Sequence, residues 1–214
     1  MNEMDLNNID VLSGDEKAAE RNRQILENKN VKSFNIMGST GSGKTALIES
    51  IKDILSGNQR IGAVAGDVTG VSDYERFQKV QIPAYNLNTD SKCHLDAGLV
   101  NRALKGLNLD EIDVLFVENV GNLICPAGFE LGTERDIAVI SVTEGDDMVR
   151  KQPKMFLRSD ILVINKIDLA DAIGVDPQVP RKDYEKIHPD GKVFLTSAKT
   201  GKGIDKLIQE VGIE

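Results

Sequence analysis

Residues 31–45, VKSFNIMGSTGSGKT, decide the fold of this chain. An apolar run over 31–37, which suits a buried strand, leads directly into Gly-x-x-x-x-Gly-Lys-Thr, the phosphate-binding P-loop pattern. Behind it, five apolar residues recur at helical spacing and predict a helix with one buried face: Leu47, Ile48, Ile51, Ile54 and Leu55. Gly57 is expected to end this helix. A strand, a glycine-rich turn and a helix in this order predict a nucleotide-binding α/β domain.

The eight P-loop residues each fit a role in holding phosphate. They are Gly38, Ser39, Thr40, Gly41, Ser42, Gly43, Lys44 and Thr45. The glycines let backbone N–H groups converge on phosphate oxygens at the N-terminus of a helix. We expect Lys44 to reach the terminal phosphates and the Thr45 hydroxyl to bind Mg²⁺. A glycine-rich turn without a ligand is the weaker interpretation of so complete a pattern.

The remaining apolar residues fall into short runs that suit further strands. The runs lie at 60–65, 112–117, 137–142, 161–164 and 193–195, and helical spacing over 204–211 predicts a last helix. Near-continuous apolar strands of this kind are typical of a parallel sheet that is covered on both faces. We therefore expect residues 31–214 to form a single P-loop NTPase domain with a mainly parallel sheet and helices on both faces.

The N-terminal 30 residues differ from this pattern in being mostly polar. Ser13 followed by Glu16 has the form of a capping box, which predicts a surface helix over 15–28 in an N-terminal helical extension, residues 1–30. Neither a basic flank followed by an apolar run nor a membrane-length apolar stretch occurs, so we expect a soluble, cytoplasmic protein. With 26 Lys and Arg against 34 Asp and Glu, the net charge of −8 disfavours binding to nucleic acid or to an anionic membrane.

Two segments beyond the P-loop indicate which base the nucleotide carries. Asn165, Lys166 and Asp168 follow the predicted strand at 161–164, in a pattern that resembles the guanine-recognition segment of GTPases. A carboxylate at Asp168 can accept hydrogen bonds from guanine N1–H and from the exocyclic amine, whereas adenine presents a different edge. The later segment Ser197, Ala198 and Lys199 resembles the supporting guanine loop. Together these segments favour GTP over ATP.

Hydrolysis of GTP also needs Mg²⁺ and a positioned water. Glu118, Asn119, Val120 and Gly121 resemble the Asp-x-x-Gly switch segment of GTPases, with Glu in place of Asp. Glu118 is therefore a candidate magnesium ligand, and Asp67 and Asp73 are two more, which the sequence cannot rank. Asn122 stands where signalling GTPases carry a water-positioning Gln. We therefore expect slow intrinsic hydrolysis, with GTP acting mainly as a conformational switch.

Metal-binding chemistry is limited by the two Cys and two His in the chain. Cys93 and His94 are adjacent, and Cys125 follows the segment 118–121 closely. Thiolate and imidazole are good ligands for Zn²⁺ and Ni²⁺, and three such ligands leave one coordination position open. Inert thiols buried as small apolar side chains are the stronger interpretation from composition alone. In a reducing cytoplasm a disulfide between the two cysteines is the less favoured pairing.

These motifs together resemble the HypB family, the nickel-incorporation GTPases of hydrogenase maturation. The resemblance spans roughly residues 31–210 and adds four further runs to the P-loop: Gly66 to Thr69 with Asp73, Cys93 to Ala97, Glu118 to Leu123 with Cys125 and Pro126, and Ser141 to Gly145. It implies a GTPase that dimerises around its nucleotide and holds Ni²⁺ or Zn²⁺ near the subunit interface through Cys93, His94 and Cys125. It also implies two partners, a HypA-type nickel metallochaperone and the precursor of the hydrogenase large subunit.

Three other functions compete with this resemblance. A urease-type nickel accessory GTPase shares the loop chemistry but carries Cys-x-His where this chain has adjacent Cys93 and His94. A partitioning or membrane-associated ATPase usually has Lys directly after the first P-loop glycine, where this chain has Ser39. A regulatory GTP-binding switch with inert cysteines differs only in lacking the metal site.

Overall fold

The computed structural model describes residues 3–55, 57–90, 92–125 and 128–214, with side chains from residue 14 onward. Its seven-stranded parallel sheet has the order β3-β2-β4-β1-β5-β6-β7. The strands are β1 (Lys32–Met37), β2 (Ile61–Asp67), β3 (Ala84–Asn88), β4 (Val114–Glu118), β5 (Arg135–Ser141), β6 (Ile161–Asn165) and β7 (Lys192–Leu195). Strand order reverses at β1, which pairs with β4 and β5. The carboxyl end of β1 is thus the point where open α/β sheets bind ligands.

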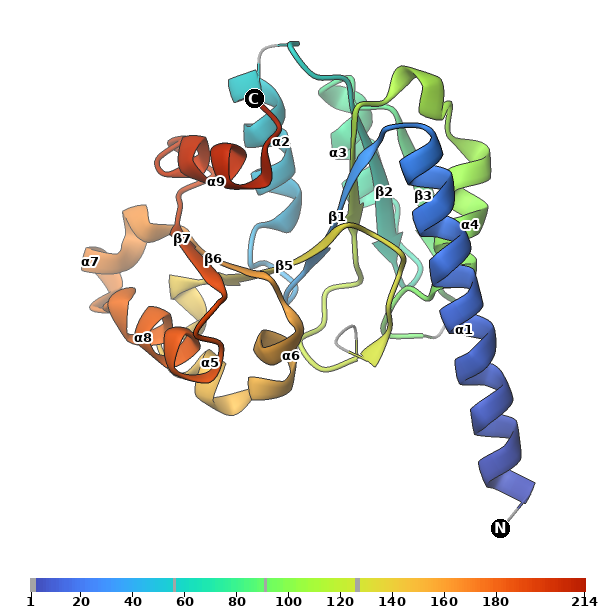
Figure 1. Ribbon diagram of the computed structural model, residues 1–214. Coiled ribbons are helices and arrows are strands. Elements are labelled where there is room, and N and C mark those ends of the chain that lie inside the picture. Colours follow the sequence, from blue (N-terminus) through green and yellow to red (C-terminus); the bar gives the residue numbers. More distant parts are fainter. Residues whose placement is uncertain (1–2, 56, 91, 126–127) are drawn as a thin grey trace.

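Helices cover both faces of the sheet (Figure 1). They are α1 (Glu3–Asn28), α2 (Lys44–Leu55), α3 (Ser72–Lys79), α4 (Ala97–Gly106), α5 (Met148–Lys151), α6 (Pro153–Arg158), α7 (Ala170–Ile173), α8 (Gln178–Ile187) and α9 (Ile204–Val211). Side chains alternate along each strand, so Val114 and Phe116 of β4 pack towards α2, α3 and α9, whereas Leu115 and Val117 face the layer of α1 and α4. The sheet is therefore buried on both sides, as the apolar runs predict. Among the described residues, no helix combines the length and the apolar composition that a membrane span needs.

The expected fold class is confirmed, and all six predicted strands are found, with ends that differ from the predicted ends by at most two residues. The helix at 204–211 is found at the residues predicted, as α9. One strand, β3, was not predicted, because Ala84–Asn88 is half polar and only partly buried at the edge of the sheet. Within α2, Ile54 is 42% exposed, so its assignment to the buried face is wrong. The α2 helix ends at Leu55, and Gly57 follows with a positive φ of 86°.

The N-terminal helix also differs from the prediction. It runs without a break from Glu3 to Asn28, so Ser13 lies inside it and does not cap it. Extending an existing helix costs less than nucleating one, and a local cap signal does not stop it. Figure 1 shows the first half of α1 projecting beyond the domain, whereas the second half lies along α4. There Ala18, Ala19 and Leu26 are buried, so this half is part of the packed structure.

Candidate functional site

The P-loop connects β1 to α2 and places its phosphate-binding residues at the switch point of the sheet. Gly38 has a φ of +155°, and a side chain there would collide with the backbone of Val139 on the neighbouring strand β5. Lys44 is buried, and its Nζ donates hydrogen bonds to the carbonyl oxygens of Gly38 (3.3 Å) and Ser39 (3.1 Å). The ammonium group is thus already held over the loop. A cavity of about 490 Å³ opens beside it and is lined by residues of the P-loop, β2, α3 and β4.

The three carboxylates predicted as magnesium ligands lie around this cavity but are not equivalent. Thr45 Oγ1 lies 2.8 Å from Oδ1 of Asp73 and 3.0 Å from Oε1 of Glu118. Asp67 lines the same cavity, but its Oδ1 accepts the backbone N–H of Val68 at 2.6 Å. The structure therefore groups Thr45 with Asp73 and Glu118, whereas the hydrogen bond of Asp67 is to its own loop.

Glu118 is the most unusual carboxylate of the site. It is 2% exposed, and its Oε2 is buried without a hydrogen-bond partner among the described residues. Burial raises its pKa to about 7, and Asp73 adds to the rise, whereas Lys44, with Nζ 3.9 Å away, opposes it. A carboxylate oxygen left unpaired beside a threonine hydroxyl and a second carboxylate fits a site for a hard divalent cation such as Mg²⁺.

The predicted guanine segments lie against the P-loop, far from it in sequence. Asn165 at the end of β6 donates to the carbonyl of Ser42 (3.1 Å) and accepts the N–H of Ala198 (3.0 Å). Lys166, in a left-handed conformation, donates to the carbonyl of Gly41 at 2.6 Å. Ser197 Oγ donates to Oδ1 of Asp168 at 2.6 Å, which fixes this carboxylate. Lys199 is exposed in the turn that follows.

The switch-like segment after β4 folds back onto the P-loop. A side chain at Gly121 would overlap Thr40, whose hydroxyl donates to the Gly121 carbonyl at 3.2 Å. Asn122 forms an isolated bridge with Gly38, and its Oδ1 accepts the N–H of Ile124 at 2.8 Å. Asn122 therefore shapes the turn that leads to Cys125.

The three predicted metal ligands come together in space. The ligand atoms of Cys93, His94 and Cys125 all lie within 4.8 Å of one another, although 32 positions separate the cysteines. The structure joins the two sulfurs in a disulfide, which contradicts the expectation of separate thiols. The fold holds their Cα atoms 6.1 Å apart, which is within the range that a disulfide spans. Pro126 of the same motif lies outside the described residues.

His94 is held by an aromatic neighbour that the sequence did not single out. Its ring stacks on Phe129 with centroids 3.8 Å apart and an angle of 11° between the planes. Burial lowers the pKa of His94, with Lys92 adding to the effect and Asp96 opposing it. The imidazole is therefore neutral near pH 7, the form that binds a metal. Phe129 lies four residues after Cys125, and only the folded loop shows that it meets His94.

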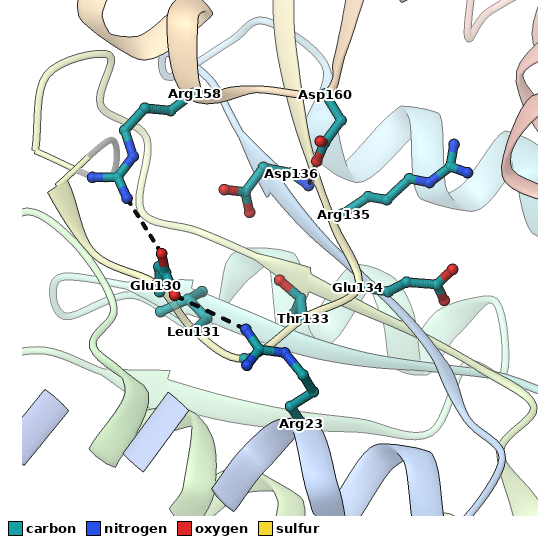
Figure 2. Close-up of a pocket in the computed structure, with 10 residues that line it drawn as sticks. Arg23, Glu130, Leu131, Thr133, Glu134, Arg135, Asp136, Arg158 and Asp160 are labelled. Carbon is teal, nitrogen blue, oxygen red and sulfur yellow. Dashed lines mark hydrogen bonds and ion pairs between the residues drawn. The ribbon is translucent and has the colours of Figure 1, made fainter. Parts of the chain in front are cut away.

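A further residue that sequence reasoning missed is Arg76, on α3. It lines the nucleotide cavity, and its guanidinium binds Glu49 of α2 at 2.5 Å and lies 4.0 Å from Asp73. A second hollow, of about 220 Å³, lies at the opposite end of β5 and β6 (Figure 2). There Arg23 and Arg158 both point to Glu130, at 3.9 and 3.6 Å. The P-loop residues line the first cavity and not this hollow, so the phosphate-binding chemistry belongs to the first cavity.

Comparison with known proteins agrees with this geometry. A family model for the CobW/HypB/UreG nucleotide-binding domain matches residues 32–194. A Methanocaldococcus jannaschii protein named probable hydrogenase maturation factor HypB is 50% identical over 200 residues, which cover 94% of this chain and 90% of that relative. The chain belongs to the HypB family. It is thus a P-loop NTPase of the hydrogenase maturation factors.

Two solved HypB structures share the whole fold. The crystal structure of the Archaeoglobus fulgidus hydrogenase maturation factor HypB has a TM-score of 0.87 at 41% identity, covering 94% of this chain and 98% of that one. HypB from Helicobacter pylori, solved in complex with nickel, has a TM-score of 0.88 at 31% identity, covering 92% and 93%. The fold of this chain is therefore that of the HypB structures.

Proposed function

We propose that this chain is a GTP-binding and GTP-hydrolysing metallochaperone that supports nickel insertion into [NiFe]-hydrogenase. One observation carries the proposal. The residues that converge as metal ligands are Cys93, His94 and Cys125. The segment of Cys93 and His94 is hydrogen-bonded to residues that line the nucleotide cavity, and Cys125 follows the lining residues 118–121 in the chain. Nickel is the cargo in this proposal, and the nucleotide controls how it is held.

The nucleotide site suits GTP with Mg²⁺. The P-loop backbone and Lys44 bind phosphates, while Thr45, Glu118 and Asp73 are placed to hold the cation. Asp168, fixed by Ser197, reads the guanine edge. Bound Mg²⁺ would neutralise charge on the phosphate oxygens. Arg76 is the cation placed to assist, but its ion pair with Glu49 must break first. This arrangement, together with the absence of a Gln at position 122, supports slow intrinsic hydrolysis.

The metal site suits a soft or borderline divalent ion once the disulfide is reduced. Two thiolates and one neutral imidazole bind both Ni²⁺ and Zn²⁺, and they leave a position open for a ligand from another subunit or a client. A closed structural zinc site needs four ligands. An incomplete set is therefore better suited to transferring an ion than to storing it.

Exposed apolar residues beside both sites support the proposed partners. Ile124, next to Cys125, is 67% exposed, and Val68 and Val71, next to the nucleotide cavity, are 36% and 47% exposed. Side chains of this kind are favourable to bury against a second copy of the chain in a GTP-dependent homodimer. We place a HypA-type metallochaperone upstream, the hydrogenase large-subunit precursor downstream, and the protein in the cytoplasm.

Guanine specificity and nickel binding test the proposal together. The reduced chain should bind Mg·GTP at least tenfold more tightly than Mg·ATP, hydrolyse it at less than one turnover per second, and bind Ni²⁺ in equilibrium dialysis. The double variant Cys93→Ala, Cys125→Ala should bind GTP normally and lose this nickel. Equal nickel binding by both proteins would leave a regulatory GTP switch as the better assignment.

A further inference from the structure

Residues 89–95, here called the metal-binding segment, contain Cys93 and His94 and end at Leu95, whose side chain packs in the protein core. Leu95 directly follows His94 and is fully buried. Its side chain and the carbonyl oxygen of Glu118 fill the space that a side chain at Gly66 would need. Leu95 therefore packs against the carboxyl ends of the paired strands β2 and β4, which carry Asp67 and Glu118. A shift of either strand end must displace Leu95 or be resisted by it.

Asn119 links Leu95 to the nucleotide site by a direct hydrogen bond. Its side chain is 1% exposed, and its Oδ1 accepts N–H groups from Leu95 and Val120, both at 3.0 Å. One carboxamide thus holds the first residue after His94 and the residue that continues the switch-like segment. Asn119 also follows Glu118 in the chain. Any rotation of the Glu118 backbone is therefore passed to the residue that anchors Leu95.

The other end of the metal-binding segment is attached to the nucleotide site as well. Thr89 N–H donates to the carbonyl of Asp67 at 2.9 Å, and Asp90 N–H donates to that of Val68 at 3.0 Å. Both bonds are backbone to backbone, so no single side chain makes them. Of these two hydrogen-bonded attachments, only the one through Asn119 is made by a side chain.

We propose that Asn119 is the positioning residue through which nucleotide state sets the position of Cys93 and His94. This inference rests on the proposed function and adds the residue that connects the nucleotide site to the metal site. Mg·GTP holds Glu118 in a conformation that GDP does not, Asn119 moves with its neighbour, and the Leu95 N–H follows the carboxamide. Because coupling between two sites is reciprocal, nickel held by Cys93 and His94 favours the same conformation of Glu118.

Asn35 on β1 offers a matched control. It is as buried as Asn119, and its Oδ1 accepts from Asn119 Nδ2 at 3.2 Å, the opposite end of the carboxamide from Leu95. Its own Nδ2 donates to Asp136 at 2.9 Å, and Asp136 lies in the hollow of Figure 2. Loss of Asn35 removes one buried hydrogen bond to Asn119 but leaves the bond to Leu95 in place.

The test compares nickel affinities in two nucleotide states. The Kd for Ni²⁺ is measured on the reduced full chain with Mg·GDP and with a non-hydrolysable Mg·GTP analogue. We expect the two values to differ at least tenfold in the wild type and in Asn35→Ala, and to agree within twofold in Asn119→Ala. A ratio retained in Asn119→Ala, a wild-type ratio near one, or an equal loss in Asn35→Ala overturns the proposal.

Sedimentation of each variant with the analogue checks the oligomeric state. A loss of coupling that accompanies a loss of dimerisation places the connection at the subunit interface and overturns the proposal. We expect Asn119→Ala to associate as the wild type does.

A second measurement needs neither a variant nor a metal. Hydrogen exchange at the Leu95 amide of the wild-type chain should change at least tenfold between Mg·GDP and the Mg·GTP analogue, because its acceptor moves. An unchanged exchange rate overturns the proposal even if Asn119→Ala fails to fold. If the wild type binds no nickel, the proposed function fails, while this measurement still decides whether Asn119 responds to the nucleotide.

Discussion

The nucleotide site and the metal site of this chain are neighbours, but they are built in different ways. Residues 38–45 make most of the phosphate site from one continuous turn, whose lysine and threonine are buried and already hydrogen-bonded. The metal site takes Cys93 and His94 from one loop and Cys125 from another, and all three are only partly buried. Local sequence creates the first site, whereas the second exists only where two loops meet. The geometry of the second site therefore depends on how the two loops are placed relative to each other.

The largest expected effect comes from Lys44→Ala, which should weaken nucleotide binding and leave nickel binding unchanged. Lys44→Ala removes a charged donor from the phosphates and should weaken GTP binding at least 100-fold, roughly 3 kcal/mol. The affinity of the nucleotide-free reduced chain for Ni²⁺ should stay within twofold of the wild type. Calorimetry on both ligands measures this, with Lys52→Ala at the other end of α2 as the control. A parallel fall in nickel affinity would show that the sites do not differ as described.

Oxidation of the two cysteines should have the opposite effect, weakening nickel binding and leaving nucleotide binding unchanged. With Cys93 and Cys125 joined, neither sulfur is a thiolate, so Ni²⁺ binding should weaken at least 100-fold while GTP binding stays unchanged. Reduction should restore the nickel site. Dialysis against Ni²⁺ before and after reduction measures the change, and Cys125→Ser, which cannot form the bond, should be insensitive to oxidation. Tight nickel binding by the oxidised chain would exclude the cysteines as ligands.

The buried carboxylate of Glu118 should lower the free energy of unfolding of the nucleotide-free protein while it strengthens binding of Mg·GTP. Burial raises its pKa from 4.5 to about 7, so the ionised form destabilises the free protein. This penalty is absent below about pH 4.5, the unfolded-state value, and fully present above about pH 7. Glu118→Gln should therefore raise the free energy of unfolding by roughly 2–3 kcal/mol at pH 8 and hardly at pH 4.

Urea unfolding of the nucleotide-free chain at the two pH values measures the effect of Glu118→Gln. The exposed Glu75→Gln serves as the control, with little change expected at either pH. The same Glu118→Gln variant should bind the Mg·GTP analogue more weakly than the wild type. Equal stability gains at pH 4 and pH 8 would rule out ionisation of Glu118 as the cause.

The smallest effect concerns the positioning of His94. Phe129→Ala removes the ring that stacks on the imidazole, a contact worth about 1 kcal/mol, so Ni²⁺ affinity should fall about fivefold. Phe129→Tyr keeps the ring and should retain the affinity, and neither change should affect GTP binding. Competition of each reduced variant with a nickel chelator measures the difference. An unchanged affinity in Phe129→Ala would show that the loop backbone alone orients His94.

The contrast between the two sites also explains what the sequence could predict. The P-loop and α9 are determined by residues close together in the chain, so their spacing was sufficient. By contrast, β3 is a half-polar edge strand, and α1 extends through Ser13 because a helix, once formed, propagates. These outcomes depend on neighbours in space or on cooperativity, which short windows of sequence do not contain.

The same limit applies within the candidate sites. The sequence could name Cys93, His94 and Cys125, but neither their disulfide nor the stack of His94 on Phe129 could be predicted, because both depend on how two loops meet. Asp67 and Asp73 could not be ranked, since only the turn of α3 places Asp73 beside Thr45. The sequence named Asn119 only as part of the switch-like segment 118–121 and predicted no role for its side chain. Its hydrogen bond to Leu95 spans 24 positions and needs the sheet to bring the loops together.

The central claim is that the nucleotide and the metal bind at two sites that influence each other. It is tested most directly by the affinity of the reduced chain for the Mg·GTP analogue, measured without metal and with saturating Ni²⁺. Reciprocity requires the Kd to shift by the same factor by which the nucleotide shifts nickel affinity, and we predict at least tenfold. Identical affinities with and without Ni²⁺ would contradict the account.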